Sequence, residues 1–409
     1  MKWQEIIFFD LYAEPSRNGV YKSQEHHGQG VKIVNMGEIF AYGIISNQEM
    51  KRLEMNDSEI EKSGLIDGDL LFARRSLVES GAGKCSLVEN LSEPTTFESS
   101  IIRVRLNYQL SRPKFYYYWF KSNKGRGSIQ ALVTGTNVKG IKGSDLKNIK
   151  VDYPPLNEQE KIVEILSKYD DLIQNNRRRI ELLEESARLL YREWFVYLRF
   201  PGHEHTPIID GIPEGWKNGT VGELAKVTSG FAFKSQDWEQ EGNPVIKIKN
   251  IVGDGSINLT NCDCINDTIA EKASRFILSS GNLLIAMTGA TVGKVGIMPN
   301  TDKKYYLNQR VGVFTTIKNI EYFLYPFFID DFAQTQIKNY AGGAAQPNIS
   351  STQIESISLL IPDIFLLNIY IDNVTSYFQL RQNLIEQNEQ LQQARDILLP
   401  RLMNGEIAV

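Results

Sequence analysis

A long heptad pattern constrains this chain more than any other feature of its sequence. After Pro154 and Pro155, apolar residues recur at alternating spacings of four and three, as in the a and d positions of a coiled coil. The prolines predict that a helix begins there, with Asn157 as its N-cap and acids in its first turn. This first seam consists of Ile162, Leu166, Tyr169, Ile173, Asn176, Ile180, Leu183, Ala187, Leu190 and Trp194. Such a seam needs a partner helix.

The partner helix is predicted in the same chain, over residues 362–405. Each residue of a second seam stands 208 positions after its counterpart in the first, and Pro362 follows Pro154 by the same offset. Two unrelated amphipathic helices in separate cores are the alternative. We favour one antiparallel pair, because a single offset covers the helix start and the whole seam. The second seam consists of Tyr370, Val374, Tyr377, Arg381, Leu384, Asn388, Leu391, Arg395, Leu398 and Leu402.

The two seams also predict a register. Each seam contains one asparagine, and a pairing that places Asn176 opposite Asn388 disfavours slipped registers, since these leave a buried amide unpaired. In this register Leu183 faces Arg381, whose stem can cover apolar surface while its head reaches water. The alternative is that both asparagines are partly solvated and fix no register.

The residues before the two helices resemble each other as well. The strand-like runs GDLLFAR and GNLLIAM correspond, as do SIIRVRL and RVGVFTT, and an aromatic helical stretch, a Gly-rich loop and a strand that ends in proline follow in both halves. These patterns predict an α+β fold with two mixed, strand-rich globules and two long helices. Pro/Gly punctuation marks a linker between the halves. The expected segments are 1–155, first globule; 156–200, first helical region; 201–212, linker; 213–362, second globule; and 363–409, second helical region.

Composition is that of an ordinary soluble globular protein, with 42% hydrophobic and 23% charged residues. No run of eighteen apolar residues indicates a membrane span, and the N-terminus lacks the layout of a signal peptide. We therefore expect a cytoplasmic protein in which Cys85, Cys262 and Cys264 are reduced thiols. A net charge of −4 argues against a uniformly basic nucleic-acid surface, so such a surface has to be a local patch.

Signatures of catalysis and of cofactor binding are weak. The Gly-Lys pairs at 83–84 and 293–294 lack the Ser or Thr of a phosphate-binding loop and are interpreted as hairpin turns. Adjacent His26 and His27 in a polar loop are typical of solvated residues, and the Cys and His residues complete no zinc pattern. We find no glycine-rich cofactor fingerprint and no Asp/Asn-Pro-Pro-aromatic methyltransferase signature. The expectation is a chain with no catalytic residue, no cofactor and no metal.

Basic residues at turns and strand ends favour DNA binding instead. Lys and Arg suit phosphate contacts, while Asn, Gln and Arg can make bidentate contacts to base edges. For any single residue, ordinary solvated surface is the alternative. The candidates in the first half are Lys22, Arg74, Arg75, Lys84, Lys124, Arg126, Asn137, Lys139 and Lys142. Those in the second half are Lys234, Lys249, Lys294, Gln309, Arg310, Gln346 and Asn348. The base-reading candidates among them are Arg74, Arg75, Asn137, Gln309, Arg310, Gln346 and Asn348.

Five segments carry a family resemblance. They are YPPLNEQEKIVEIL and LLEESARLLYREWF in the first helical region, IPEGWKNGTVGELAKVTSGFAFKS and QPNIS in the second globule, and LQQARDILLPRLMNGEI in the second helical region. With these segments, nearly the whole chain resembles the specificity subunit of a Type I DNA restriction-modification system. The chain departs from the family in two places. The first globule lacks the Pro-x-Gly-Trp opening found at 213–216, and FLLN replaces the usual Leu-x-Glu-Gln near the start of the second helix, which weakens its capping box.

The resemblance implies a non-catalytic subunit that recognises a split, asymmetric site in double-stranded DNA. Each globule would be a target-recognition domain for one half-site, and the helices would pack antiparallel and set the spacer. Two methyltransferase subunits would bind the helical regions, with two restriction subunits where a nuclease partner exists. The charged helix faces at Arg177–Arg179 and Glu184–Glu185 are the expected partner surface. A stand-alone coiled-coil scaffold or DNA-binding repressor is the alternative function, and a self-contained methyltransferase or nuclease is disfavoured by the missing signatures.

Overall fold

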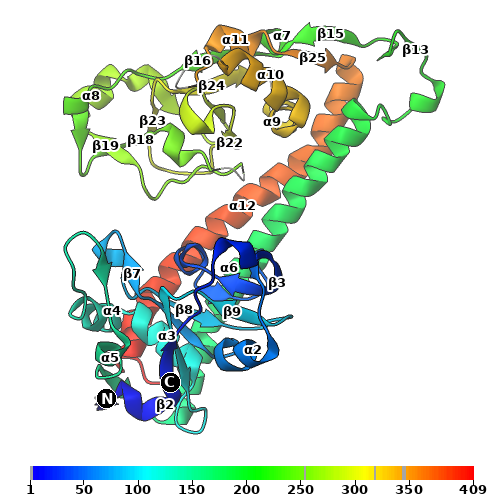
Figure 1. Ribbon diagram of the computed structural model, residues 1–409. Coiled ribbons are helices and arrows are strands. Elements are labelled where there is room, and N and C mark those ends of the chain that lie inside the picture. The colour runs from blue at the N-terminus through cyan, green and yellow to red at the C-terminus, as the bar shows by residue number, and fades with distance from the viewer. Residues whose placement is uncertain (1–2, 253–254, 317–318, 343–346) are drawn as a thin grey trace. The chain divides into compact units, whose positions relative to one another are not determined.

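The computed structural model describes residues 3–252, 255–316, 319–342 and 347–409. The chain divides into two compact units, which are described separately. Unit 1 comprises Met1–Leu172 and Leu391–Val409, and unit 2 comprises Ile173–Gln390. Each unit contains a strand-rich globule and a stretch of both long helices, α6 (Leu156–Tyr191) and α12 (Ile364–Met403) (Figure 1). The predicted mixture of helices and strands, with long helices, is confirmed.

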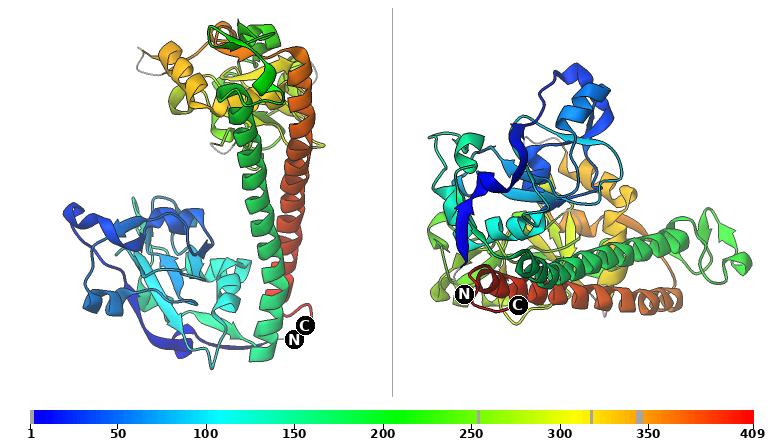
Figure 2. Two further views of the ribbon diagram at one scale, coloured as in Figure 1. Left: turned by 90° about the vertical axis from the view of Figure 1, so that its right-hand side faces the viewer. Right: turned by 90° about the horizontal axis from the view of Figure 1, so that it is seen from below.

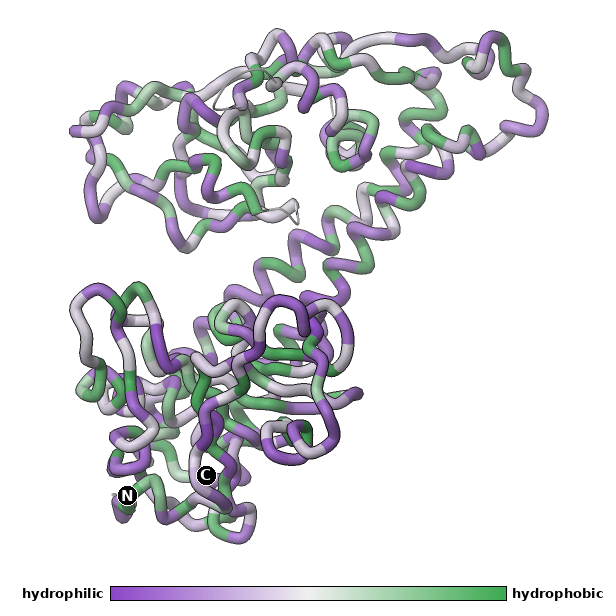
Figure 3. Tube along the Cα trace, in the orientation of Figure 1, coloured by the Kyte–Doolittle hydropathy of each residue, from purple (hydrophilic) through white to green (hydrophobic). Residues whose placement is uncertain are grey.

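The globule of unit 1 is built on a five-stranded sheet in the order β2-β10-β6-β8-β4. Its inner strands are almost wholly buried, because they are short apolar runs covered on both faces. Figure 3 shows hydrophobic residues gathered along these strands. A second sheet has the order β5-β3-β9, and β1 pairs with β12. The bounds are β1 (Gln4–Ile7), β2 (Tyr12–Asn18), β3 (His27–Val34), β4 (Ile44–Ile45), β5 (Lys51–Leu53), β6 (Leu70–Ala73), β8 (Cys85–Val88), β9 (Thr95–Phe97), β10 (Ile101–Leu106) and β12 (Lys150–Tyr153).

The strand pairings of unit 2 repeat those of unit 1. The order β16-β24-β21-β22 corresponds to β2-β10-β6-β8, the parallel pair β18-β23 corresponds to β3-β9, and β15-β25 corresponds to β1-β12. The predicted internal repeat is therefore confirmed at the level of hydrogen-bonded neighbours. The bounds are β15 (Lys217–Thr220), β16 (Ala225–Ser229), β18 (Asn243–Ile246), β21 (Leu283–Ala286), β22 (Val295–Ile297), β23 (Tyr305–Leu307), β24 (Val311–Thr316) and β25 (Ser358–Ile361).

Aromatic helices fill the cores of both units. In unit 1, α3 (Pro113–Lys121) buries Trp119, whose indole donates a hydrogen bond to Asp152 Oδ2 at 2.9 Å. In unit 2, α9 (Glu321–Ile329) stacks Tyr322 on Phe378 of α12, with ring centroids 4.5 Å apart.

Shorter helices and strands complete the description. The helices are α1 (Met36–Ala41), α2 (Asp57–Ser63), α4 (Asn123–Gln130), α5 (Gly143–Leu146), α7 (Val221–Leu224), α8 (Asp267–Lys272), α10 (Asp331–Ala341) and α11 (Ser351–Glu355). The strands are β7 (Arg75–Ser76), β11 (Lys139–Gly140), β13 (Ile208–Ile209), β14 (Ile212–Pro213), β17 (Trp238–Glu239), β19 (Asp263–Ile265) and β20 (Ile277–Leu278). Within the described ranges, no helix has the length and apolar character needed to span a lipid bilayer.

The starts of the two long helices differ from the prediction. α6 begins at Leu156, directly after the prolines, so Asn157 lies in the first turn and its prediction as the N-cap was wrong. At the start of α12, Asp363 caps the helix. Its Oδ1 accepts hydrogen bonds from the backbone N–H groups of Phe365 at 2.9 Å and Leu366 at 3.2 Å. This cap takes the place of the capping box that the FLLN segment weakens.

In each unit, the early part of one long helix lies beside the late part of the other (Figure 2). In unit 1, Ile162 and Leu166 of α6 share a buried cluster with Leu399 and Leu402 of α12. The cluster of unit 2 joins the other parts of the helices, Ala187 and Tyr191 of α6 and Tyr370 and Val374 of α12. The apolar seam is therefore buried only in part: nine of its residues are buried, while Tyr169, Ile180, Leu183, Leu190, Tyr377, Leu391 and Leu398 are half-buried.

The polar residues of the seam do not pair as predicted. Asn176 Nδ2 donates to Gln387 Oε1 at 3.5 Å, and the buried Oδ1 of Asn388 has no hydrogen-bond partner among the described residues, so the predicted hydrogen bonding between the two asparagines is not formed. The prediction for Arg381 was also wrong, because its guanidinium group is buried and does not reach water. It pairs with Glu184 of α6, and its Nη2 donates to the carbonyl of Gly255 at 3.0 Å.

Candidate nucleic-acid interface

Four of the predicted contact residues lie together in unit 1. β7 pairs antiparallel with β11, which ties the Gly-rich loop to the end of β6. The backbone N–H of Ile141 also donates to the carbonyl of Arg74 at 3.0 Å. These ties form a recess of about 300 Å³, called recess 1. Its lining includes Arg74, Arg75, Lys139 and Lys142, together with Thr134 and Gly135.

The same construction recurs in unit 2. Thr288 forms an antiparallel bridge with Asn348, and the backbone N–H of Ile349 donates to the carbonyl of Met287 at 2.9 Å. The resulting recess, called recess 2, has a volume of about 620 Å³. Its lining comprises Ser229, Met287, Thr288, Gln309, Arg310, Asn348, Ile349, Ser350, Ser351 and Thr352.

The two recesses occupy equivalent places in the repeat. Met287 of GNLLIAM corresponds to Arg74 of GDLLFAR, and in both halves the carbonyl of this residue accepts a hydrogen bond from an isoleucine of the Gly-rich loop. The next residues along the strands, Arg75 and Thr288, bridge the loop at Gly140 and Asn348. In the sequence these candidates lie in separate segments, and in the fold they line two recesses.

Most side chains of the two recesses are free to meet a ligand. Among the described residues, the side chains of Arg75, Lys139, Lys142, Gln309, Arg310 and Asn348 make no hydrogen bond or ion pair. Arg74 makes one long contact, from Nη1 to the carbonyl of Ser99 at 3.5 Å. No carboxylate of the described residues lines either recess. Such uncompensated donors suit phosphate oxygens and base edges. Asn137 lies exposed in the loop of recess 1, and Gln346 lies outside the described residues.

Other candidates are held by partners within the protein. Lys22 pairs with Glu59 at 2.7 Å, and Lys249 pairs with Asp263 at 2.7 Å. Lys124 bonds to Asp152 at 2.7 Å and to Glu5 at 3.0 Å. Burial acts to lower the pKa of Lys124, but these hydrogen bonds outweigh it and raise the pKa above its ordinary value.

Four further candidates lie apart from the recesses. Lys84 donates to the carbonyl of Phe40 at 2.7 Å, and Arg126 donates to that of Ser80 at 2.9 Å. Burial lowers the pKa of both cations. Lys234 and Lys294 are exposed and line neither recess.

The sequence prediction omitted the hydroxyl groups of recess 2. Thr288 and the segment Ser350–Thr352 bring these groups to the same surface as Gln309 and Asn348. The QPNIS segment points to this place, because its Asn348 bridges to Thr288 and its Ser350 caps α11. Within the described ranges, no cluster of three or more His, Cys, Asp and Glu side chains is placed to hold a metal ion.

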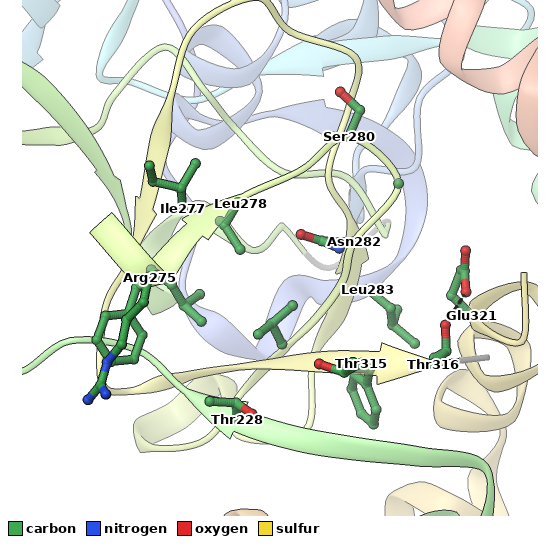
Figure 4. A pocket seen from close by; sticks show the side chains of 15 residues that line it. Thr228, Arg275, Ile277, Leu278, Ser280, Asn282, Leu283, Thr315, Thr316 and Glu321 are labelled. Carbon is green, nitrogen blue, oxygen red and sulfur yellow. Dashed lines mark hydrogen bonds between the residues drawn. The ribbon is translucent and has the colours of Figure 1, made fainter. Parts of the chain in front are cut away.

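A second hollow of unit 2 reflects a difference between the repeats. It has a volume of about 410 Å³, and Figure 4 shows Asn282, Leu283 and Thr315 among its lining side chains. In unit 1 the corresponding position on the sheet carries arginines. Arg105 bonds through Nε to Oδ1 of the fully buried Asp69 at 2.7 Å, and Arg103 pairs with Glu14 at 2.5 Å.

Asn282 and Asp69 are equivalent by geometry as well as by sequence. Asp69 Oδ2 accepts the backbone N–H of Ile66 at 2.9 Å, and Asn282 Oδ1 accepts that of Ser279 at 2.7 Å. The hollow of unit 2 therefore lies where unit 1 is filled by arginine side chains bound to carboxylates.

Comparisons with known proteins agree with these observations. Residues 22–185 and 213–364 match the family described as Type I restriction modification DNA specificity domain. The MjaVIII specificity subunit of Methanocaldococcus jannaschii is 24% identical over 78% of this chain and 76% of the relative. The putative MjaX specificity subunit of the same organism is 24% identical over 100% of this chain and 94% of the relative.

A solved structure supports the fold. The Type I restriction-modification S subunit from M. genitalium has a TM-score of 0.57 at 17% identity, covering 98% of this chain and 96% of that one. The two family matches cover most of the chain and correspond to its two repeats. The chain therefore belongs to the family of Type I restriction-modification DNA specificity subunits, the non-catalytic subunits that direct these enzymes to DNA.

Proposed function

We propose that this chain recognises a bipartite, asymmetric site in double-stranded DNA, with one half-site read by each globule. The observation that carries the proposal is the recurrence of one recess in both halves of the repeat, built from equivalent strand ends and loops. Each recess presents donors that suit phosphates and base edges. Because the two linings differ in sequence, the half-sites differ as well.

In this proposal the segments have separate tasks. Residues 1–155 and 213–362 are the target-recognition domains, residues 201–212 are a linker, and residues 156–200 and 363–409 are helical regions that pair antiparallel and set the spacer. The α6 helix has 36 residues. At about 1.5 Å per residue this is roughly 54 Å, which exceeds the roughly 34 Å of one DNA turn by about half.

The proposal also includes protein partners. Two methyltransferase subunits bind the helical regions and carry the chemistry, and two restriction subunits join where they exist. The names of the relatives as specificity subunits of restriction enzymes support this assignment. We assign the methyltransferase contact to the exposed run Arg177–Arg179 of α6. Glu184 does not belong to this surface, because it pairs with Arg381 in the structure.

A domain exchange tests the proposed function. Residues 213–362 are replaced by those of another family member, the full chain is assembled with its methyltransferase, and methylated positions are mapped across a genome. We expect one half-site to change while the other half-site is retained. The reciprocal exchange of residues 1–155 is the matched control and should change the other half-site.

Two results would contradict this proposal. Exchange of one segment that alters both half-sites, or neither, would show that the globules are not independent readers. Site-specific binding by a chain that assembles with no methyltransferase would favour a stand-alone repressor.

A further inference from the structure

We infer that the two recesses read their half-sites by different chemistry, guanine through arginine in recess 1 and adenine through side-chain amides in recess 2. This inference rests on the proposed function and adds the class of base that each unit recognises. It is based on the β-bridge that joins each Gly-rich loop to its strand, Arg75–Gly140 in unit 1 and Thr288–Asn348 in unit 2.

At this β-bridge, the longer side chain belongs to the strand in unit 1 and to the loop in unit 2. In recess 1, Arg75 on the strand stands opposite Gly140 on the loop, and in recess 2, Thr288 on the strand stands opposite Asn348 on the loop. A glycine leaves room for the arginine beside it, and a threonine leaves room for the longer asparagine. Each bridge therefore presents one long polar side chain, a guanidinium in unit 1 and an amide in unit 2.

The rest of recess 1 is cationic. Its lining contains Arg74, Arg75, Lys139 and Lys142 and no carboxylate, and the amide of Asn137 is exposed in the same loop but does not belong to this lining. Arginine pairs bidentately with the O6 and N7 acceptors of guanine, whereas the point charge of a lysine suits phosphate. We assign base contacts to the arginines and backbone contacts to the lysines.

The rest of recess 2 is mostly neutral. Gln309 and Asn348 face the recess from two different segments, and Arg310 is the one cation among the described residues that line it. Both segments are fixed by backbone hydrogen bonds, from Gln309 N to the carbonyl of Phe231 at 2.9 Å and from Ile349 N to that of Met287 at 2.9 Å. The donor and acceptor of an amide match N7 and N6 of adenine. Two amides on hydrogen-bonded backbone are suited to this contact, because less ordering is needed on binding.

The difference in charge has a consequence for salt dependence. Each phosphate contact that is lost reduces the magnitude of the slope, in a plot of the logarithm of the DNA-binding constant against the logarithm of salt concentration, by about 0.9. Removal of both Lys139 and Lys142 should therefore reduce the slope by about 2. Loss of the amides of Gln309 and Asn348 should leave the slope unchanged.

The test is a selection of randomised DNA duplexes by the full chain assembled with its methyltransferase subunits. The Arg74→Lys/Arg75→Lys variant keeps its charge but loses the guanidinium groups that can make bidentate contacts. The preference for guanine in one conserved block of the selected DNA, that is, in one half-site, should therefore fall by roughly 5- to 150-fold. The Gln309→Ala/Asn348→Ala variant should lose adenine preference in the other block to a similar degree. The controls are Arg17→Lys and Asn339→Ala, which lie outside the recesses and should select the wild-type site.

A gain-of-function variant keeps the test independent of any loss of folding. Thr288→Arg combined with Asn348→Gly places the bridge residues of recess 1 into unit 2, and guanine preference should appear in the second block. The inference is overturned if the wild type selects two blocks and the recess variants leave the base preferences unchanged. Selection of no two-block site by the wild type would instead refute the proposed function.

Discussion

Arg381 of α12 is paired with Glu184 of α6, although the arginine side chain is only 2% exposed. The same guanidinium donates to the carbonyl of Gly255, so one residue joins both helices to the globule of unit 2. Loss of one member of a buried ion pair is costly, because the other charge stays buried without compensation. The stability of unit 2 should therefore depend strongly on this pair.

We predict that Glu184→Leu destabilises unit 2 by about 3–5 kcal/mol. The double variant Glu184→Leu/Arg381→Leu should be closer to the wild type, since it leaves no buried charge. Urea unfolding followed by tryptophan fluorescence measures both effects. Glu185→Leu is the control and should change stability by less than about 1 kcal/mol, because Glu185 pairs with Arg188 on the partly exposed face of the same helix. Equal losses in the single and double variants would argue against a buried pair.

The arginine cluster of unit 1 leads to a second prediction. Asp69→Asn keeps the hydrogen bond from the backbone of Ile66 but removes the negative charge beside Arg105. We expect a loss of about 2–4 kcal/mol in unit 1, seen as faster hydrogen exchange in β6 and β10. The equivalent change in unit 2, Asn282→Asp, is the control, because Asn282 lines the hollow and no arginine is hydrogen-bonded to it among the described residues. Unaltered exchange in the Asp69→Asn variant would show that the ion pair adds no stability.

The three cysteines should differ in reactivity. All are free thiols, and Cys85 is buried while Cys262 and Cys264 are partly exposed. Burial raises the pKa of Cys85 strongly, and it raises the pKa of Cys262 to about 11. Because the thiolate is the reactive form, a raised pKa slows alkylation at neutral pH. Mass spectrometry after iodoacetamide treatment should show Cys264 modified first, Cys262 later, and Cys85 only after unfolding. Early modification of Cys85 would contradict its burial.

The charged run of α6 leads to a prediction about assembly. Reversal of Arg177, Arg178 and Arg179 to glutamate should weaken binding of the methyltransferase subunits, with a larger effect at low salt. The isolated chain should still fold, since all three side chains are exposed. A salt titration of complex formation measures this effect. Lys161→Glu, also exposed on α6, is the single-charge control. Wild-type assembly by the triple variant would place the partner surface elsewhere.

Much of the fold could be predicted from the sequence, because the repeat is marked by residues with strong local preferences. The heptad seam, the prolines before each helix and the glycines before the strand-like runs recur in both halves. The polar seam residues could not be predicted in the same way. The amide of Asn176 meets Gln387, which is next to the predicted position, and Arg381 finds a carboxylate one position beyond the predicted Leu183. Heptad spacing predicts which layer a residue occupies, while the contacts of its head group depend on neighbours outside the seam.

The candidate interface was only partly predictable. Arg75 and Lys139 are far apart in sequence, and they come together only because β7 pairs with β11. Composition indicated residue types that suit nucleic acid but could not separate free cations from paired ones. Lys22 is held by Glu59, for example, and this pairing depends on tertiary structure.

In the proposed function, one chain carries two readers, one for each half-site, at a fixed separation. The most direct test of this proposal is the sequencing of DNA duplexes selected from a random pool by the wild-type chain assembled with its methyltransferase. We expect two different conserved blocks separated by an unconserved spacer of constant length, with block centres roughly 10 base pairs or more apart. A single contiguous block, or two blocks whose separation varies freely, would contradict it.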